Sequence, residues 1–137
     1  MEWLAMAIAS FSTLVLGFIW YNPKLFGNAW MESVGMTEED ASKASMPLIL
    51  GLSFILGAVI AYRLNMGAGY HPEEDQNFLH GAFHAAQTAG FYAIPVLIIN
   101  FLNEQRSLKG ILINAVYWLI AFALMGGILY AWKGAGL

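Results

Sequence analysis

Residues 78–101 read FLHGAFHAAQTAGFYAIPVLIINF, a run that contains no Asp, Glu, Lys or Arg. About 20 predominantly apolar residues are enough for a helix to cross the hydrocarbon core of a bilayer. Three further uncharged apolar runs occupy residues 3–21, 46–62 and 110–132. A lipid-exposed strand would leave its backbone donors and acceptors unpaired, so each run is expected to be a helix. The sequence therefore predicts an all-α fold, a single bundle of four transmembrane helices over residues 1–137.

The composition supports a membrane protein and narrows its partners. Hydrophobic residues make up 59% of the chain and charged residues 11%, far below the roughly 25% charge of a soluble domain. The net charge is −3, with acids gathered at residues 38–40 and 73–75. No basic patch favours nucleic acid or anionic lipid headgroups, so the bilayer is the expected partner and nucleic acid is not. The chain has no cysteine, which excludes disulfides and thiolate metal ligands.

The first loop carries its own helix signals. Pro23 is expected to stop the first helix, and a short apolar stripe at helical spacing then predicts a short helix in the interface plane. The stripe consists of Leu25, Phe26, Ala29 and Trp30. Thr37, followed by three acids, predicts the capped start of another helix, which would run through residues 41–44 into the second span. Pro47 is expected to mark a kink or a restart there.

The third span is expected to begin outside the membrane, at Pro72 and the acids after it, because Pro suits a first helical position. Pro95 breaks a backbone hydrogen bond, which predicts a kink near Ala93. The short loop at residues 102–109 makes spans three and four an antiparallel hairpin.

An even number of spans places both termini on one side of the membrane. Loops one and three carry Lys24, Lys43, Arg106 and Lys109, against Arg63 and Lys133 on the opposite side. Loops rich in Lys and Arg stay in the cytoplasm, so loops one and three are expected there. Both termini are then expected on the opposite, outer side of the inner membrane.

A polar stripe enters the third span at helical spacing: Asn77, His80, His84 and Gln87. Polar side chains at membrane depth are candidates for function because their exposure to lipid is costly. Three interpretations stay open: hydrogen bonds between helices, a crevice that binds or passes a small solute or proton, and a metal or haem site. The spacing of His80 and His84, at i and i+4 on a helix, suits two ligands of one metal ion. A third ligand could come from His71 with Glu73 or Glu74, whose distance from the pair the sequence does not fix.

Two rows of small residues lie beside the stripe, Gly81, Ala85, Ala89 and Ala82, Ala86, Gly90. Small rows let helix backbones approach closely, so the third helix is expected at the centre of the bundle or at a subunit interface. A homo-oligomer, or a complex with a membrane partner subunit, is expected. Asn100 and Asn114 are positioned to bond across the hairpin of spans three and four.

Several segments together resemble a known family. They are LGFIWYNP at residues 16–23, with LFG and AWM at residues 25–27 and 29–31, His80–Gly81, and LINAVYW at residues 112–118 with LMG and AW at residues 124–126 and 131–132. They are similar to the bacterial membrane family called domain of unknown function 1761, whose usual Asn-Ala-Gly-Tyr has Val116 at the glycine position here. The resemblance implies four helices in a bacterial cell membrane and carries no established activity. It singles out Trp20, Tyr21, Pro23, Phe26, Gly27, Trp30, His80, Gly81, Asn114 and Tyr117 as candidates for a shared site.

The expected function is that of a non-enzymatic membrane protein that binds or passes a small solute, or that serves as a subunit of a membrane assembly. The alternative is a small membrane enzyme or redox or metal protein that uses His80 and His84 as ligands. The sequence assigns no cofactor. No Ser-His-Asp or nucleophile-elbow pattern supports a hydrolase.

Overall fold

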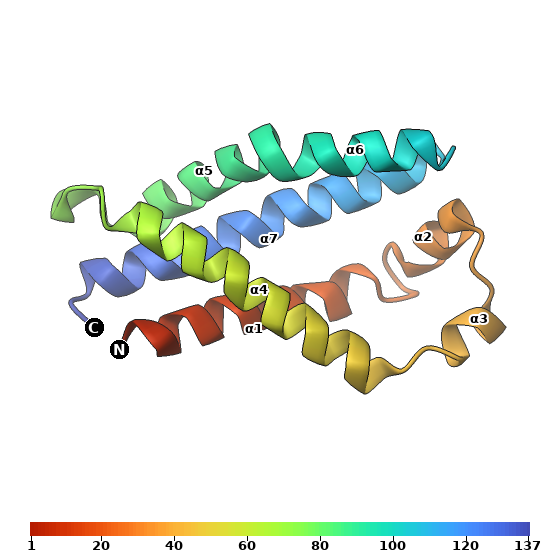
Figure 1. The fold of residues 1–137 in the computed structure, drawn as a ribbon, viewed down its shortest axis with the longest axis horizontal. Coiled ribbons are helices and arrows are strands. Elements are labelled where there is room, and N and C mark those ends of the chain that lie inside the picture. Colours follow the sequence, from red (N-terminus) through yellow and green to blue (C-terminus); the bar gives the residue numbers. More distant parts are fainter.

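The computed structural model describes residues 1–137 and consists of helices joined by short loops (Figure 1). The longer helices are α1 (Glu2–Trp20), α4 (Met46–Ala68), α5 (Phe78–Thr88), α6 (Ile94–Asn103) and α7 (Leu108–Gly134). Short elements complete the chain: α2 (Gly27–Val34), α3 (Glu38–Ser42), a 3₁₀ turn η1 (Glu73–Asp75) and a π-helical turn η2 (Ala89–Ala93). Four helical stretches are long and apolar enough to cross a membrane, with α5, η2 and α6 forming one of them. The all-α, four-helix prediction is confirmed.

The first loop contains both helices that were expected, with different boundaries. The interface stripe falls partly on α2, which begins at Gly27, so Leu25 and Phe26 precede it. Thr37 caps α3 through a reciprocal pair with Asp40, and these hydrogen bonds lower the pKa of the Asp40 carboxyl. The helix does not run on through residues 41–44 into the second span, and of the two outcomes expected at Pro47, a kink or a restart, the structure shows the restart. The chain leaves the helix after Ser42 and restarts at Met46, with Pro47 in the first turn of α4.

The third span does not begin at Pro72, which corrects the sequence prediction. The acids form the separate turn η1, and α5 starts at Phe78 with Asn77 as its cap. The Asn77 side chain accepts a hydrogen bond from the His80 N–H at 3.0 Å, which satisfies one of the unpaired donors at the helix start. Near Ala93, where a kink is expected, the structure has the π-helical turn η2, which ends two residues before Pro95. Proline cannot donate the regular helical bond, and a π-turn accommodates that loss.

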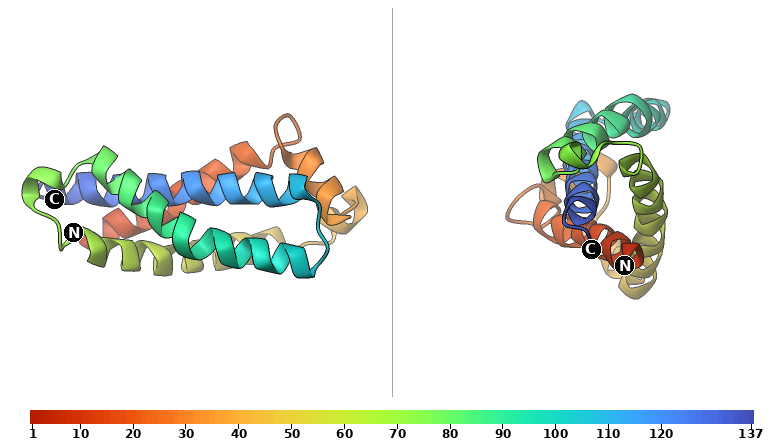
Figure 2. Two further views of the ribbon diagram at one scale, coloured as in Figure 1. Left: turned by 90° about the horizontal axis from the view of Figure 1, so that it is seen from above. Right: turned by 90° about the vertical axis from the view of Figure 1, so that its left-hand side faces the viewer.

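The centre of the bundle is α7, not the third span. In its most apolar window 56% of the residues are buried, against 11% in the third span. Helices α1, α4, α5 and α6 all pack against α7, while α4 makes few contacts with α5 and α6. The end-on view in Figure 2 shows the far, yellow end of α4 well away from α6, whereas the near, green end of α4 lies closer to it. Both termini lie at one end of the bundle, the end that also holds the loop between α4 and α5 (Figure 1).

Candidate functional site: three histidines at the mouth of a groove

All three histidines of the chain converge at the end of the bundle that carries the termini. His80 and His84 lie in the first two turns of α5, one turn apart on the same face. His71 comes from the loop after α4 and lies against both. The ring centroid of His71 is 4.9 Å from that of His80 and 4.5 Å from that of His84, and the rings of His80 and His84 are also 4.5 Å apart.

The nitrogens of the three rings face a common point. One ring nitrogen from each histidine can be chosen so that all three lie within 4.8 Å of one another. The closest pair is His80 Nε2 and His71 Nδ1, at 3.1 Å. Two imidazole nitrogens bound to one tetrahedral ion at about 2.1 Å would lie about 3.4 Å apart. The closest pair is near that spacing, and the wider pairs, at distances of up to 4.8 Å, would have to move closer to hold one ion.

Close packing of α5 on α7 positions two of these histidines. A Cβ on Gly81 would lie 2.3 Å from the Gly126 carbonyl oxygen and 2.6 Å from the Tyr130 side chain. Only glycine allows this approach, and it brings the start of α5 down onto Tyr130, which forms the floor of the site. The Tyr130 ring lies 5.3 Å from His71 and 6.5 Å from His84, and it is stacked nearly parallel to the latter.

The loop between α4 and α5 positions the third histidine. The Gln76 side-chain amide donates to the His71 carbonyl at 3.0 Å, and the His71 N–H donates to the Ala68 carbonyl at the end of α4. Asp75 in the same loop places its Oδ1 3.8 Å from His80 Nδ1. His80 thus turns Nε2 toward the cluster and Nδ1 toward a carboxylate. At 3.8 Å this pair is an ionic contact and not a hydrogen bond, so Asp75 only lies near the nitrogen that a carboxylate would contact on a metal-bound histidine.

Of the predicted polar stripe, the structure brings only His80 and His84 into the histidine cluster. Asn77 is a helix cap, and Gln87 is exposed on the outer surface of α5. Of the groups considered as a third metal ligand, His71 reaches the cluster and the exposed Glu73 and Glu74 do not. His71 is nine residues before His80, and its approach depends on the turns in the loop, which no periodic pattern reveals. Tyr130, Arg63 and Asp75 also carry no local sequence signal of their position beside the cluster.

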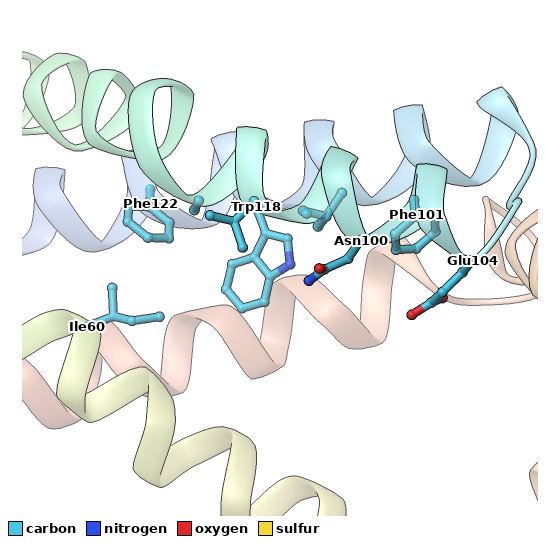
Figure 3. A pocket seen from close by; sticks show the side chains of 9 residues that line it. Ile60, Asn100, Phe101, Glu104, Trp118 and Phe122 are labelled. Carbon is cyan, nitrogen blue, oxygen red and sulfur yellow. The ribbon is translucent and has the colours of Figure 1, made fainter.

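A long groove opens beside the histidines. One cavity, of about 860 Å³, has His71, His84, Tyr130, Arg63 and Thr88 at its polar end. A second cavity, of about 410 Å³, extends toward Asn100, Phe101 and Glu104 near the opposite end of α6 (Figure 3). The two share Ile60, Ala93, Val96 and Phe122 in their walls. The two cavities therefore adjoin one another between α4 and the third span, above α7, and are together called the groove.

Most of the residues singled out by the family resemblance lie elsewhere, at the other end of α1 and α7. Tyr21 Oη donates to Asn114 Oδ1, Tyr117 Oη donates to the Thr13 carbonyl at 2.8 Å, and Trp20 Nε1 donates to the Ile113 carbonyl at 3.1 Å. The expected bond between Asn100 and Asn114 is absent, because Asn114 faces α1 and Asn100 lines the groove.

The first loop folds onto the same aromatic cluster. Phe26 lies 4.5 Å from Trp20, and Trp30 lies 5.5 Å from Tyr21, measured between ring centroids. A Cβ on Gly27 would lie 2.3 Å from the Tyr21 carbonyl oxygen, which explains the glycine, while Pro23 is exposed in the turn. This cluster anchors α1 and the first loop to α7. The resemblance therefore marks two separate places, this cluster and the pair His80–Gly81.

Comparison with known families agrees with that resemblance. The family described as "Protein of unknown function (DUF1761)" matches residues 4–130, nearly the whole chain, and the protein belongs to this family. No curated protein and no solved structure matches the chain.

Proposed function

We propose that this member of the DUF1761 family is a metal-binding membrane protein. It holds a divalent transition-metal ion on His71, His80 and His84 and presents that ion to a small solute in the groove. The observation that carries the proposal is the convergence of every histidine in the chain on one point, with ligand nitrogens within 4.8 Å of one another.

The donor set favours zinc. Zn²⁺ takes imidazole ligands in tetrahedral sites, and catalytic zinc sites keep three protein ligands and leave the fourth position to water or substrate. Here the fourth position would face the groove, because His71 and His84 line its wall. Imidazole also binds Cu²⁺ and Ni²⁺, and Cu²⁺ more tightly than Zn²⁺, so the chain's preference must be measured rather than assumed.

A hydrogen bond between His71 and His80 is the competing use of the same nitrogens. In that case the cluster would only hold the loop against α5, as in the hydrogen-bond interpretation of the stripe. Three imidazoles that form only one hydrogen bond between them suit a cation better than they suit one another. Asp75 beside His80 adds the negative charge that a bound dication would favour.

The proposal combines two functions that the sequence left open, binding of a small solute and binding of a metal by His80 and His84. Both would take place where the histidine cluster borders the groove. The site lies at the end of the bundle that holds the termini (Figure 1). With the termini outside the inner membrane, as the distribution of Lys and Arg favours, the metal would be acquired from outside the cytoplasm.

The test is metal content of the protein purified in mild detergent with a tag that contains no histidine. After dialysis against Zn²⁺ and removal of free metal, elemental analysis should find one zinc per chain. Single changes His71→Gln, His80→Gln and His84→Gln should each lower zinc retention at least tenfold, with the helical circular dichroism spectrum unchanged. The matched control is Gln87→Ala, on the same helix but outside the cluster, which should retain zinc. Trace zinc in the unaltered protein, or equal retention by the histidine variants, would refute the proposal.

A further inference from the structure

The groove has two chemically different ends. At the histidine end, Arg63 lies in the wall and has no carboxylate partner or hydrogen bond. Its Nη1 and the Tyr130 hydroxyl both lie 4.0 Å from where a Cβ on Gly67 would be, so the missing side chain leaves room between them. At the other end the groove meets Asn100 and the carboxylate of Glu104 (Figure 3).

Between these ends the walls are apolar. The shared middle consists of Ile60, Ala93, Val96 and Phe122, with Leu97 and Trp118 continuing it toward Glu104. A bare ion or a polar solute would lose its hydration there without gaining partners, which costs several kcal/mol. The groove therefore suits binding of an amphiphile, and it does not suit passage of an ion.

The geometry points to a single-chain amphiphile with an anionic headgroup as the occupant of this groove. Its headgroup would lie between Arg63 and the histidine cluster, and its hydrocarbon chain would follow the apolar walls toward Trp118. Charge sets this orientation, because Arg63 attracts the anion at one end and Glu104 repels it at the other. The two cavities, of about 860 and 410 Å³, fall within or near the usual range for ligand pockets, roughly 300–1,000 Å³.

The inference deepens the proposed function by naming the solute class, and it rests on that function only for contact between the headgroup and the metal. Arg63 and the apolar walls act without a metal. The sequence has no basic patch that would attract anionic lipids to a surface, and this site depends instead on one exposed arginine, Arg63, beside an apolar groove that is open along its side.

The experiment uses the purified protein and palmitic acid that carries a photoreactive diazirine on its chain. The matched probe is the same chain ending in an alcohol. Irradiation followed by peptide mass spectrometry should place adducts on the groove walls, in the peptides that contain Val96 and Phe122, and the acid should label at least tenfold more than the alcohol. Unlabelled palmitate should compete.

Two variants test the two halves of the site. Arg63→Gln should lower the preference for the acid about tenfold, which corresponds to about 1.4 kcal/mol, because the headgroup loses its charge-assisted hydrogen bond. Ile60→Trp should fill the groove and abolish labelling there by both probes. The control is Ile55→Trp, the same change on α4 at an exposed position that lines neither cavity, and it should label like the unaltered protein.

The outcomes separate this inference from the proposed function. Zinc retention without acid-selective labelling of the groove would overturn the amphiphile and leave the metal site. Acid-selective labelling of an unaltered protein that retains no zinc in the elemental analysis would support the amphiphile and refute the metal proposal. Labelling spread evenly over lipid-facing helices, unaffected by Ile60→Trp, would show that the probe only partitions around the protein, and it would overturn the inference.

Discussion

Asp75 is the carboxylate nearest to the histidine cluster, with its Oδ1 3.8 Å from His80 Nδ1. A carboxylate that accepts a hydrogen bond from the outer nitrogen of a metal-bound imidazole fixes the orientation of the ring, and Asp75 would need to approach His80 by roughly 0.6–1 Å to do so. We therefore predict that Asp75→Asn weakens zinc binding roughly 10- to 100-fold while the fold is retained. A competition titration with a zinc-binding dye measures the change. Glu74→Gln, in the same turn but exposed and outside the cluster, should leave the affinity unchanged, and equal loss in both variants would reduce the effect to the charge of the loop.

At the residue scale, local signals predicted local roles well. Thr37 with Asp40 was recognised as a helix start because a cap and its acid are three residues apart in sequence. His80 and His84 were recognised as a pair because one helical turn separates them. Asn77 was misplaced in the stripe, because an Asn three residues before a helical position fits a cap as well as a side-chain row. His71 was named without a position, since its approach is fixed by contacts of Gln76 and the turn η1 rather than by spacing.

At the scale of the helix, the approach of α5 to α7 determines the site. We predict that Gly81→Ala destabilises the protein by about 1–3 kcal/mol, since a Cβ there has no room against Gly126 and Tyr130. Because any relief must move α5 outward, carrying His80 and His84 away from His71, zinc affinity should also fall. Thermal unfolding in detergent and the dye titration measure the two effects.

Gly51→Ala is the control for that change, because a Cβ on Gly51 meets nothing within 4 Å. It should be neutral or slightly stabilising, since alanine favours the helix. If Gly81→Ala behaved in the same way, the close contact between α5 and α7 would not be what positions the histidines.

The helices themselves were predictable because length and apolar character act within one segment. Which helix occupies the centre was not. The rows of small residues in the third span suggested that this span lies at the centre. However, α7 also has small residues, and its Gly126 packs directly against Gly81 and Ala85 of α5. The groove between α4 and α6 exists because these two helices do not pack against each other. The sequence of either helix alone does not show whether the two are in contact.

At the scale of the whole molecule, the arrangement leaves one small row without a partner. The row Gly81, Ala85, Ala89 is buried against α7, whereas Ala82 and Ala86 are half-buried and Gly90 is exposed. Positions 84 and 86 lie about 200° apart around a helix, so the free row faces away from His84 and the groove. A second copy that packed on this row would leave the metal site and the groove accessible.

We therefore predict that the protein self-associates through Ala82, Ala86 and Gly90, because small rows favour close contact between helices in a bilayer. Ala86→Leu should shift the mass measured by light scattering in mild detergent from oligomer to monomer, while zinc retention is unchanged. Ala85→Leu should act differently. Ala85 is 2% exposed, and its Cβ packs so closely on Gly126 that a Cβ added there would lie 2.3 Å away. Leucine at position 85 has no room against α7, so Ala85→Leu should disrupt the bundle and release zinc. An unaltered protein that is monomeric at every concentration would contradict the prediction, and an Ala86→Leu variant that remains oligomeric would place the interface on another face.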